Sequence, residues 1–246
     1  MYETCIFDLY GTLVDIHTDE KKEELWEKLA LFYAFYGAFY TPGELREAYG
    51  RLTEELSAGK RGVRKDAHEA FPEIQIEDVF EALFGAKGVQ ADEPLVRHAG
   101  QFFRILSMDR LRLYEGTKEM LQALREHGKK IYLLSNAQKI FTEYEMQALG
   151  LTPFFDGIFI SSEYGCKKPD LAFYETLLSA CGVARETAVM TGNDGTCDIE
   201  GAKRAGLATV YVRTEISPEE PLPEADYILE QMDMKKLKDI LLGQKN

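Results

Sequence analysis

A carboxylate, a glycine and a hydroxyl lie close together near the start of the chain. Asp8 follows an apolar segment, and Gly11 and Thr12 come shortly after it in the run Ile-Phe-Asp-Leu-Tyr-Gly-Thr-Leu. The carboxyl end of a buried strand is where an α/β sheet binds ligands, and a carboxylate held there can act as a nucleophile. Because an Asp-Gly turn is also common without any function, the segment gains weight only from similar signals elsewhere.

Polar residues follow three later apolar segments in a similar way. They are Ser135-Asn136, Lys167-Lys168-Pro169-Asp170, and Gly192-Asn193-Asp194 with Asp198. Because the carboxyl ends of parallel strands share one edge of a sheet, we expect these residues to meet Asp8, Tyr10 and Thr12 in one crevice. Hydroxyls, an amide, a cation and an acidic cluster together suit a phosphate and a hard divalent metal.

The elements that must position these residues alternate between apolar strands and helices. We expect strands at 4–7, 130–134, 157–160, 188–191, 208–212 and 227–229, and helices at 118–126, 140–149, 171–181, 199–205 and 234–241. Such alternation predicts parallel pairing with right-handed crossovers. The fold class is therefore α/β, with a doubly wound, Rossmann-like parallel sheet.

Residues 17–108 differ, because their apolar positions recur at helical spacing. We expect helices at 21–40, with Thr18 or Asp19 as N-cap, and at 42–58, 76–84 and 93–107. This block reads as an all-helical cap inserted after the first strand, above the strand ends. Residues 1–16 and 109–246 then form the α/β core, and residues 17–108 the cap domain.

Composition limits the partners. The 246 residues carry a formal net charge of −13, which would repel a nucleic-acid backbone or an anionic membrane over most of the surface. No apolar run approaches the roughly 18 residues that a membrane helix needs, and no basic signal region precedes the first strand. We expect a cytoplasmic protein with a small-molecule phosphorylated substrate, without nucleic-acid or membrane partners. The sequence does not indicate an oligomeric state.

In the order of its four motifs and in its inserted helical block, the chain resembles the haloacid dehalogenase superfamily. The resemblance covers nearly the whole length. It implies a hydrolase in which Asp8 is the nucleophile, Thr12 and Ser135 bind the transferred group, Lys168 neutralises its charge, and Asp194 or Asp198 holds Mg²⁺.

These roles are physically consistent with a phosphatase that works through an aspartyl phosphate. Asp8, a backbone carbonyl near Tyr10 and Asp194 would hold Mg²⁺, with Asp198 as a further ligand or as a partner of one. Hydroxyls and backbone N–H groups at Ser135 and Asn136 would hold the oxygens of the transferred group. Asn193 occupies another position where the superfamily often has aspartate. The sequence therefore does not decide which of the successive residues Asn193 and Asp194 is the metal ligand.

Tyr10 departs from the pattern of the superfamily. Phosphatases of the superfamily usually carry a second aspartate at that position, which protonates the leaving oxygen. A phenol, with a reference pKa of about 10, can donate a proton but is a poor base near neutral pH. We therefore expect a Mg²⁺-dependent phosphatase for substrates whose leaving group departs readily. The alternatives are a 2-haloacid dehalogenase-type hydrolase using Asp8, and a catalytically weak protein of this fold that binds a partner.

Other conspicuous residues have structural interpretations. We expect Asp15 to fix a loop as a hydrogen-bond acceptor, and Asp170 to cap the helix that follows Pro169. The aromatic side chains between Phe32 and Tyr40 are expected to pack between cap helices or against another subunit. The basic cluster at 60–65 is expected to be a solvated loop, or else a cluster that the cap brings to the substrate.

Overall fold

The computed structural model describes residues 2–61, 73–219 and 221–244. The strands are β1 (Thr4–Phe7), β2 (Val14–Thr18), β3 (Met108–Leu113), β4 (Lys130–Ser135), β5 (Gly157–Ile160), β6 (Ala188–Gly192), β7 (Ala208–Val212) and β8 (Tyr227–Leu229). The helices are α1 (Glu23–Phe35), α2 (Pro42–Arg61), α3 (Ile76–Gly85), α4 (Glu93–Ser107), α5 (Thr117–Glu126), α6 (Lys139–Ala148), α7 (Ser161–Tyr164), α8 (Leu171–Cys181), α9 (Gly201–Arg204) and α10 (Met234–Leu242). The described residues also form the helical segments η1 (Thr152–Phe154), η2 (Arg185–Thr187) and η3 (Gly195–Glu200), of which η3 is π-helical.

A six-stranded parallel sheet forms the core of the described part of the chain. Its strand order is β5-β4-β1-β6-β7-β8, so the chain moves outward from β1 in both directions. In such a sheet the crevice for ligands opens where the winding direction reverses, at the carboxyl ends of the central strands. Here these are the ends of β1, β4 and β6, and the predicted α/β class is confirmed.

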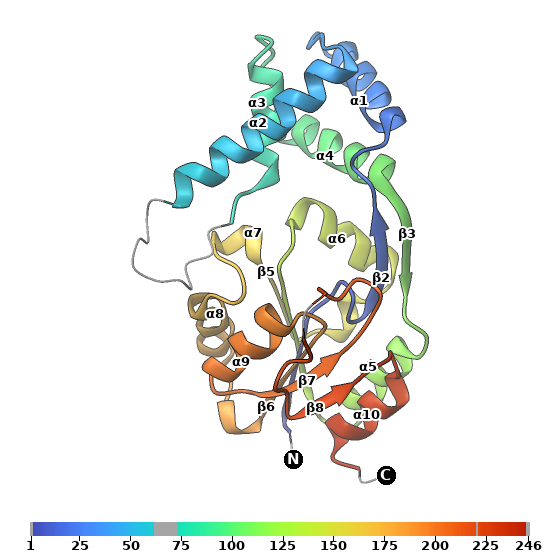
Figure 1. The fold of residues 1–246 in the computed structure, drawn as a ribbon, viewed down its shortest axis with the longest axis vertical. Coiled ribbons are helices and arrows are strands. Elements are labelled where there is room, and N and C mark those ends of the chain that lie inside the picture. Colours follow the sequence, from blue (N-terminus) through green and yellow to red (C-terminus); the bar gives the residue numbers. More distant parts are fainter. Residues whose placement is uncertain (1, 62–72, 220, 245–246) are drawn as a thin grey trace.

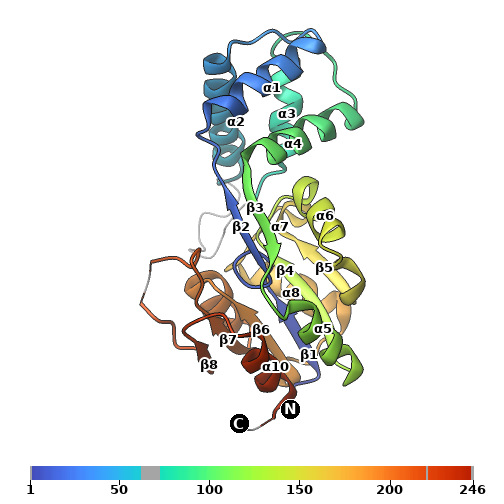
Figure 2. The ribbon, with the colours of Figure 1, turned by 90° about the vertical axis from the view of Figure 1, so that its right-hand side faces the viewer.

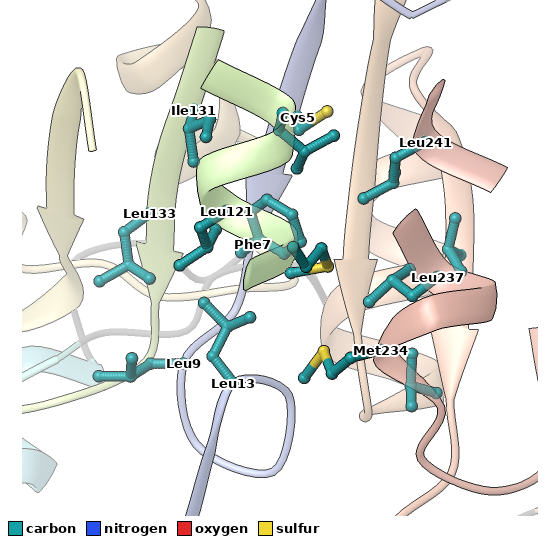
Figure 3. Close-up of a cluster of buried hydrophobic side chains, with 14 of the residues drawn as sticks. Cys5, Phe7, Leu9, Leu13, Leu121, Ile131, Leu133, Met234, Leu237 and Leu241 are labelled. Carbon is teal, nitrogen blue, oxygen red and sulfur yellow. The ribbon is translucent and has the colours of Figure 1, made fainter. Parts of the chain in front are cut away.

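Strand β1 shows how the sequence builds the layers. Successive side chains of a strand point to opposite faces. Cys5 and Phe7 accordingly join a buried cluster with α5 and α10 on one face, while Ile6 packs with residues of α8 and α9 on the other. Figure 3 shows Phe7 among the leucines of α5 and α10. Because both faces are covered, β1 is apolar until Asp8, and the first polar side chain appears at the edge of the sheet.

Helices α1–α4, which we call the helical cap, pack around a separate buried cluster beyond the carboxyl ends of the strands (Figure 1). An antiparallel pair, β2 and β3, runs between the core and the helical cap (Figure 2). This pair corrects the all-helical interpretation of residues 17–108, because His17 and Thr18 belong to β2 and Met108 begins β3. The domain bounds of 1–16, 17–108 and 109–246 stay a prediction.

Charged side chains hold the β2–β3 pair together. Asp15 accepts from Arg110 Nε at 2.9 Å and from Arg112 Nε at 2.8 Å, across the paired strands. Asp15 is therefore a hydrogen-bond acceptor, as predicted, although it lies in a strand rather than in a loop. The alternation of Arg110 and Arg112 with Leu111 and Leu113 is the period-two pattern that could have indicated β3.

The first cap helix is shorter than predicted. It begins at Glu23, after Lys22, and neither Thr18 nor Asp19 caps it; Asp19 instead accepts from the backbone N–H of Lys21. The helix ends at Phe35, because Gly37 takes a φ of +89° that continues no right-handed helix. Beyond this point the predicted apolar stripe leaves the core, and Phe39 is 71% exposed.

The remaining aromatic side chains of this stretch follow the same division. Tyr33 is fully buried, stacks on Phe84 and donates to the carbonyl of Phe80. Packing between cap helices is thus confirmed for Tyr33, whereas Phe35 and Phe39 are exposed. The side chains of the basic cluster at 60–65 lie outside the described residues. None of the described helices has the length and apolar character needed to cross a membrane.

The helical cap approaches the core closely at Gly100 of α4. A Cβ at this position would lie 2.5 Å from Ile140 Cδ1 of α6 and 3.0 Å from the ring of Phe80. Both neighbours are buried, so they have little room to shift. Glycine at position 100 therefore allows α4 to lie against α6.

We expect Gly100→Ala to lower the free energy of unfolding by about 1–2 kcal/mol, because overpacking outweighs the better helix propensity of alanine. Gly50→Ala in α2 is the matched control, since nothing lies within 4 Å of a Cβ there. It should raise the free energy of unfolding by about 0.5–1 kcal/mol. Urea titrations of both variants check this, and equal shifts of the same sign would contradict the close approach of α4 to α6.

Candidate active site

The loop after β1 presents Asp8 at the carboxyl edge of the sheet. The backbone N–H of Asp8 donates to the carbonyl of Thr191 at 3.0 Å, which continues the pairing of β1 with β6. The chain then turns at Gly11, whose φ is +82°. A Cβ at Gly11 would lie 2.3 Å from Asn193 Nδ2, so glycine is required both for the turn and for the approach of Asn193.

Three side chains from three segments contact the carboxylate of Asp8. Lys168 Nζ and Ser135 Oγ donate to Asp8 Oδ1 at 2.8 and 3.2 Å. Thr12 Oγ1 lies 3.4 Å from Asp8 Oδ2, which is a long contact. All four side chains are buried. The structure thus brings together the four residues for which the sequence predicts a nucleophile, two hydroxyl donors and a cation.

Lys168 is held between two carboxylates. Its ammonium group donates to Asp198 Oδ1 at 2.6 Å and to Asp8 Oδ1 at 2.8 Å, and its side chain is 1% exposed. Burial alone would lower the pKa of Lys168, but Asp198 and Asp8 outweigh burial and raise it. Burial and the proximity of Asp8 raise the pKa of Asp198, against the opposing effect of Lys168.

With both carboxylates ionised, this buried group of three residues carries one excess negative charge. An anionic substrate would add more negative charge at the same place. Uncompensated buried charge is costly, so phosphate chemistry here calls for a further cation. The charge balance of the described site is therefore suited to a divalent metal together with a phosphate.

Asn136 positions the main chain of Lys168 through its side chain. Asn136 Nδ2 donates to the carbonyl of Lys168 at 2.9 Å, and the N–H of Lys168 donates to Asn136 Oδ1 at 2.8 Å. This two-way hydrogen bonding joins the loop after β4 to the loop that follows α7. The predicted contact of Asn136 with substrate remains a prediction that concerns its backbone N–H.

The acidic segment after β6 separates into three different environments. Asn193 is buried, and its Oδ1 lies 3.5 Å from Thr12 Oγ1, beside the loop that carries Asp8. Asp194 caps the following helical segment by accepting from the N–H of Cys197 at 2.7 Å. Asp198 uses both oxygens, one for Lys168 and the other for the N–H of Asp194 at 3.0 Å.

This arrangement bears on the predicted metal ligands. Magnesium takes oxygen ligands, needs only one or two protein carboxylates, and keeps several waters. Among the residues that the structure describes, Asp8 Oδ2 has only the long Thr12 contact, and Asn193 Oδ1 lies near the same hydroxyl. These oxygens fit a hard cation. Within the described residues, no group of three or more His, Cys, Asp or Glu side chains is placed to hold a metal.

Tyr10 points its hydroxyl to a helix rather than to Asp8. The hydroxyl donates to Glu145 Oε2 and lies 3.1 Å from Thr142 Oγ1, both on α6. Burial and the neighbouring Glu145 raise the pKa of Tyr10, while Arg104 opposes the rise. The phenol that the sequence predicts as a proton donor is thus protonated at neutral pH, and it donates its hydrogen bond to a carboxylate of α6.

Glu145, Thr142 and Arg104 were not singled out from the sequence. Thr142 and Glu145 lie three residues apart on one face of α6, and Arg104 reaches this face from α4. A helical face that carries a buried carboxylate among apolar residues is the only local signal. The partner of that carboxylate is 41 residues away, so no spacing rule identifies it. Asp170 does cap α8 as predicted, by accepting from the N–H of Ala172.

The chain belongs to the haloacid dehalogenase-like hydrolase family, because residues 2–206 match the model of that family. It is therefore a hydrolase, and the predicted family membership is confirmed. The match covers strands β1, β4, β5 and β6 of the sheet and the helical cap, and it ends before β7.

Several relatives carry the names of phosphatases. The chain is 35% identical over 146 residues to a phosphoserine phosphatase of Thermus thermophilus, which covers 59% of this chain and 57% of that relative. The chain thus spans little more than half the length of that relative. It is 28% identical over 221 residues to a glyceraldehyde 3-phosphate phosphatase of Methanothermobacter thermautotrophicus, which covers 89% of each chain.

Solved structures share the fold. The HAD-hydrolase YfnB of Bacillus subtilis, bound to magnesium, has a TM-score of 0.56 at 22% identity and covers 98% of each chain. A 2-haloacid dehalogenase of Pseudomonas syringae has a TM-score of 0.64 at 19% identity and covers 100% of each chain. At these identities the similarity shows the fold alone, and it does not distinguish a phosphatase from a dehalogenase.

Proposed function

We propose that this hydrolase is a magnesium-dependent phosphatase that acts on a small phosphorylated metabolite through a phosphoryl-aspartate on Asp8. The observation that carries the proposal is the convergence of an ammonium and two hydroxyls on the buried carboxylate of Asp8. Phosphatase names among the relatives support the reaction class. These names do not identify the substrate of this chain.

The reaction has two steps. An oxygen of Asp8 attacks phosphorus, the bond from phosphorus to the leaving oxygen breaks, and the leaving oxygen departs as an anion that is protonated by solvent. Water then attacks phosphorus and releases a proton to solvent, the bond from phosphorus to Asp8 breaks, and phosphate departs as the Asp8 carboxylate is regenerated. Ser135 and Thr12 supply hydroxyl donors to the oxygens of the transferred group, and Lys168 supplies positive charge beside Asp8.

Magnesium, when bound, would supply the positive charge that the buried group of Asp8, Lys168 and Asp198 lacks. We assign it to the carboxylate of Asp8 and the amide oxygen of Asn193. The sequence also predicts the Tyr10 carbonyl and the Asp194 carboxylate as ligands, but we assign Asp194 to capping the N–H of Cys197 rather than to the metal. Asp198 is assigned instead to holding Lys168, because both of its carboxylate oxygens have protein donors.

We expect Asn193→Asp to tighten Mg²⁺ binding roughly tenfold, because it adds a charge to an existing oxygen ligand. Asp194→Asn should change the affinity much less, since an asparagine still caps the N–H of Cys197. Isothermal titration with Mg²⁺ in the absence of substrate measures both. Loss of Mg²⁺ binding in Asp194→Asn, with no gain in affinity in Asn193→Asp, would show that Asp194 binds the metal and that Asn193 does not.

The engagement of Tyr10 narrows the proposed substrate class. Because its hydroxyl is bound to Glu145, it offers no free proton to a leaving oxygen. Substrates with good leaving groups, such as aryl or acyl phosphates and phosphoanhydrides, need no such proton. We therefore propose that the enzyme hydrolyses these faster than alkyl phosphates.

A dehalogenase is the second candidate, and two observations favour it. The Tyr10 hydroxyl is engaged away from Asp8, and Asn193 lies beside the Asp8 loop where a metal site would gain from a carboxylate. A halide leaves without a proton, so neither feature would hinder attack of Asp8 on the carbon of a 2-haloacid. Water would then hydrolyse the resulting ester.

One screen separates these functions. Phosphate release from an aryl phosphate and chloride release from 2-chloropropionate are measured with Mg²⁺ and with a chelator. Mg²⁺-dependent phosphate release supports the phosphatase. Chloride release that persists in the chelator supports the dehalogenase and overturns the proposal. Failure of both reactions, and of a wider set of phosphorylated metabolites, favours a protein that only binds.

A further inference from the structure

Tyr10, Glu145 and Arg104 form a continuous set of contacts from the loop that carries Asp8 to the helical cap. The Tyr10 hydroxyl donates to Glu145 Oε2. Arg104 Nε donates to Glu145 Oε1 at 2.5 Å, and its Nη2 donates to Oε2 at 3.3 Å. The three residues come from the loop after β1, from core helix α6 and from cap helix α4 respectively.

This set of contacts is shielded from water. The side chains of Arg104 and Glu145 are 16% and 6% exposed. The guanidinium carbon of Arg104 lies 5.7 Å from the ring centre of Tyr10 and 5.1 Å from that of Phe141. A shielded, two-point ion pair is stronger than a surface pair, and removing one partner leaves a charge without compensation. Arg104 is therefore tied to both Glu145 and the ring of Tyr10.

The other end of α6 is also attached to the helical cap. Gln138, which precedes α6, accepts from the N–H of Ile76 at 2.9 Å and donates to the carbonyl of Ile74 at 3.0 Å. Ile140 of α6 belongs to the buried cluster of the helical cap. The cap thus contacts α6 at Gln138, Ile140 and Glu145, with α4 above α6 in Figure 1. Thr142 and Glu145 of α6 both contact the hydroxyl of Tyr10, two residues from Asp8, and of these two Glu145 is the one that Arg104 of the cap holds.

We propose that Tyr10 is a positioning residue, and that its bond to Glu145 couples the docking of Arg104 and the helical cap to the alignment of Asp8. When α4 lies against α6, Arg104 holds Glu145, and Glu145 holds the Tyr10 hydroxyl and with it the loop that carries the nucleophile. When α4 moves away, Glu145 loses its cation and the loop loses a fixed anchor. Only the kinetic part of the test rests on the proposed phosphatase function.

The kinetic test uses Tyr10→Phe, which keeps the ring against Arg104 and removes only the hydroxyl. A misaligned nucleophile lowers kcat, and we expect a loss of about tenfold with little change in KM. The loss should be the same across aryl phosphates whose leaving groups differ in pKa. A loss that grows with the pKa of the leaving group would show that Tyr10 donates the proton, and would overturn the proposal.

The second test measures the coupling without any turnover. Hydrogen–deuterium exchange is followed in the loop at 9–14 and in α4, for wild type, Arg104→Met and the milder Arg104→Lys. We expect faster exchange in both segments for Arg104→Met and a smaller effect for Arg104→Lys, which keeps the charge but loses the two-point geometry. Faster exchange in α4 alone, with the loop unchanged, would disprove the coupling even if the protein proves to be a dehalogenase.

Glu163→Gln is the matched control for both tests. Glu163 of α7 pairs with Lys139 at the start of α6, but this pair joins two core segments and is exposed. The variant should leave kcat and the exchange of residues 9–14 unchanged. An effect equal to that of Arg104→Met would mean that the loss of any ion pair made by α6 disturbs the loop, which would also contradict the proposal.

Discussion

Replacement of Asp8 by asparagine is expected to lower kcat by at least about 10⁴-fold, because the amide cannot form the covalent intermediate that both candidate reactions require. The variant is almost isosteric, and its amide oxygen can still accept from Lys168 and Ser135. It also removes the excess negative charge of the buried group, leaving Lys168 paired with Asp198. Thermal stability should therefore stay the same or rise while turnover disappears.

The measurement is direct. Wild type quenched during turnover of an aryl phosphate should carry one phosphoryl group on the peptide that contains Asp8, and Asp8→Asn should carry none. Asp156→Asn is the control. Its carboxylate accepts from the backbone N–H of Ile131 and from Lys130 Nζ, at the amino ends of β4 and β5, which are remote from Asp8. If the kcat of Asp8→Asn were within a hundredfold of that of wild type, the covalent mechanism would be disproved.

The sequence predicts several strands and helices of the core and the cap well because their signals are local. Strands 157–160, 208–212 and 227–229 and helices 93–107 and 171–181 lie at the predicted residues. Each is a short apolar run between turn residues, or an apolar stripe with a capping side chain such as Asp92 or Asp170. The convergence of Asp8, Ser135 and Lys168 follows from the same reasoning, since a parallel sheet brings the ends of its strands to one edge.

Strand β2 and the contacts of Tyr10, which the sequence does not predict, depend on residues far away in the chain. Strand β2 exists because Val14–Thr18 pairs with Met108–Leu113. The alternation at 110–113 could have indicated β3, but no local signal says that its partner lies at 14–18. The hydroxyl of Tyr10 is directed by Glu145, which is 135 residues away, and Glu145 is held by Arg104 of another helix. Spacing rules describe neighbours on one element, so contacts between elements escape them.

The environments of Asn193 and Asp194 were undecided for a different reason. Both residues follow β6, where the period-two alternation of the strand stops at Gly192. Once the alternation ends, the sequence does not say which of two successive side chains faces Asp8. The turn settles this by using Asp194 as a cap for η3, which leaves Asn193 beside Gly11 and Thr12.

Lys168→Met should lower kcat by about 10²–10³-fold, the effect expected when a charge that stabilises the transition state is removed. It should also lower the free energy of unfolding by about 3–5 kcal/mol near pH 8, because Asp8 and Asp198 are left buried without their common cation. Lys167→Met is the control. The neighbouring lysine is half-buried and makes no contact with Asp8, so both quantities should stay near the wild-type values.

The pH dependence of this loss gives the sharper test. The pKa of Asp198 is raised in the folded protein by burial and by Asp8, and Lys168 opposes this rise. Without Lys168 the pKa rises further above its unfolded value of 3.8. A raised carboxyl pKa means that the folded state binds more protons than the unfolded state, so stability falls as the pH increases above about 4.

Urea titrations of Lys168→Met at pH 5 and pH 8 should therefore show the smaller loss of unfolding free energy, relative to wild type, at pH 5. A loss that is equal at both values, or larger at pH 5, would mean that the two carboxylates do not depend on Lys168 for their charge compensation.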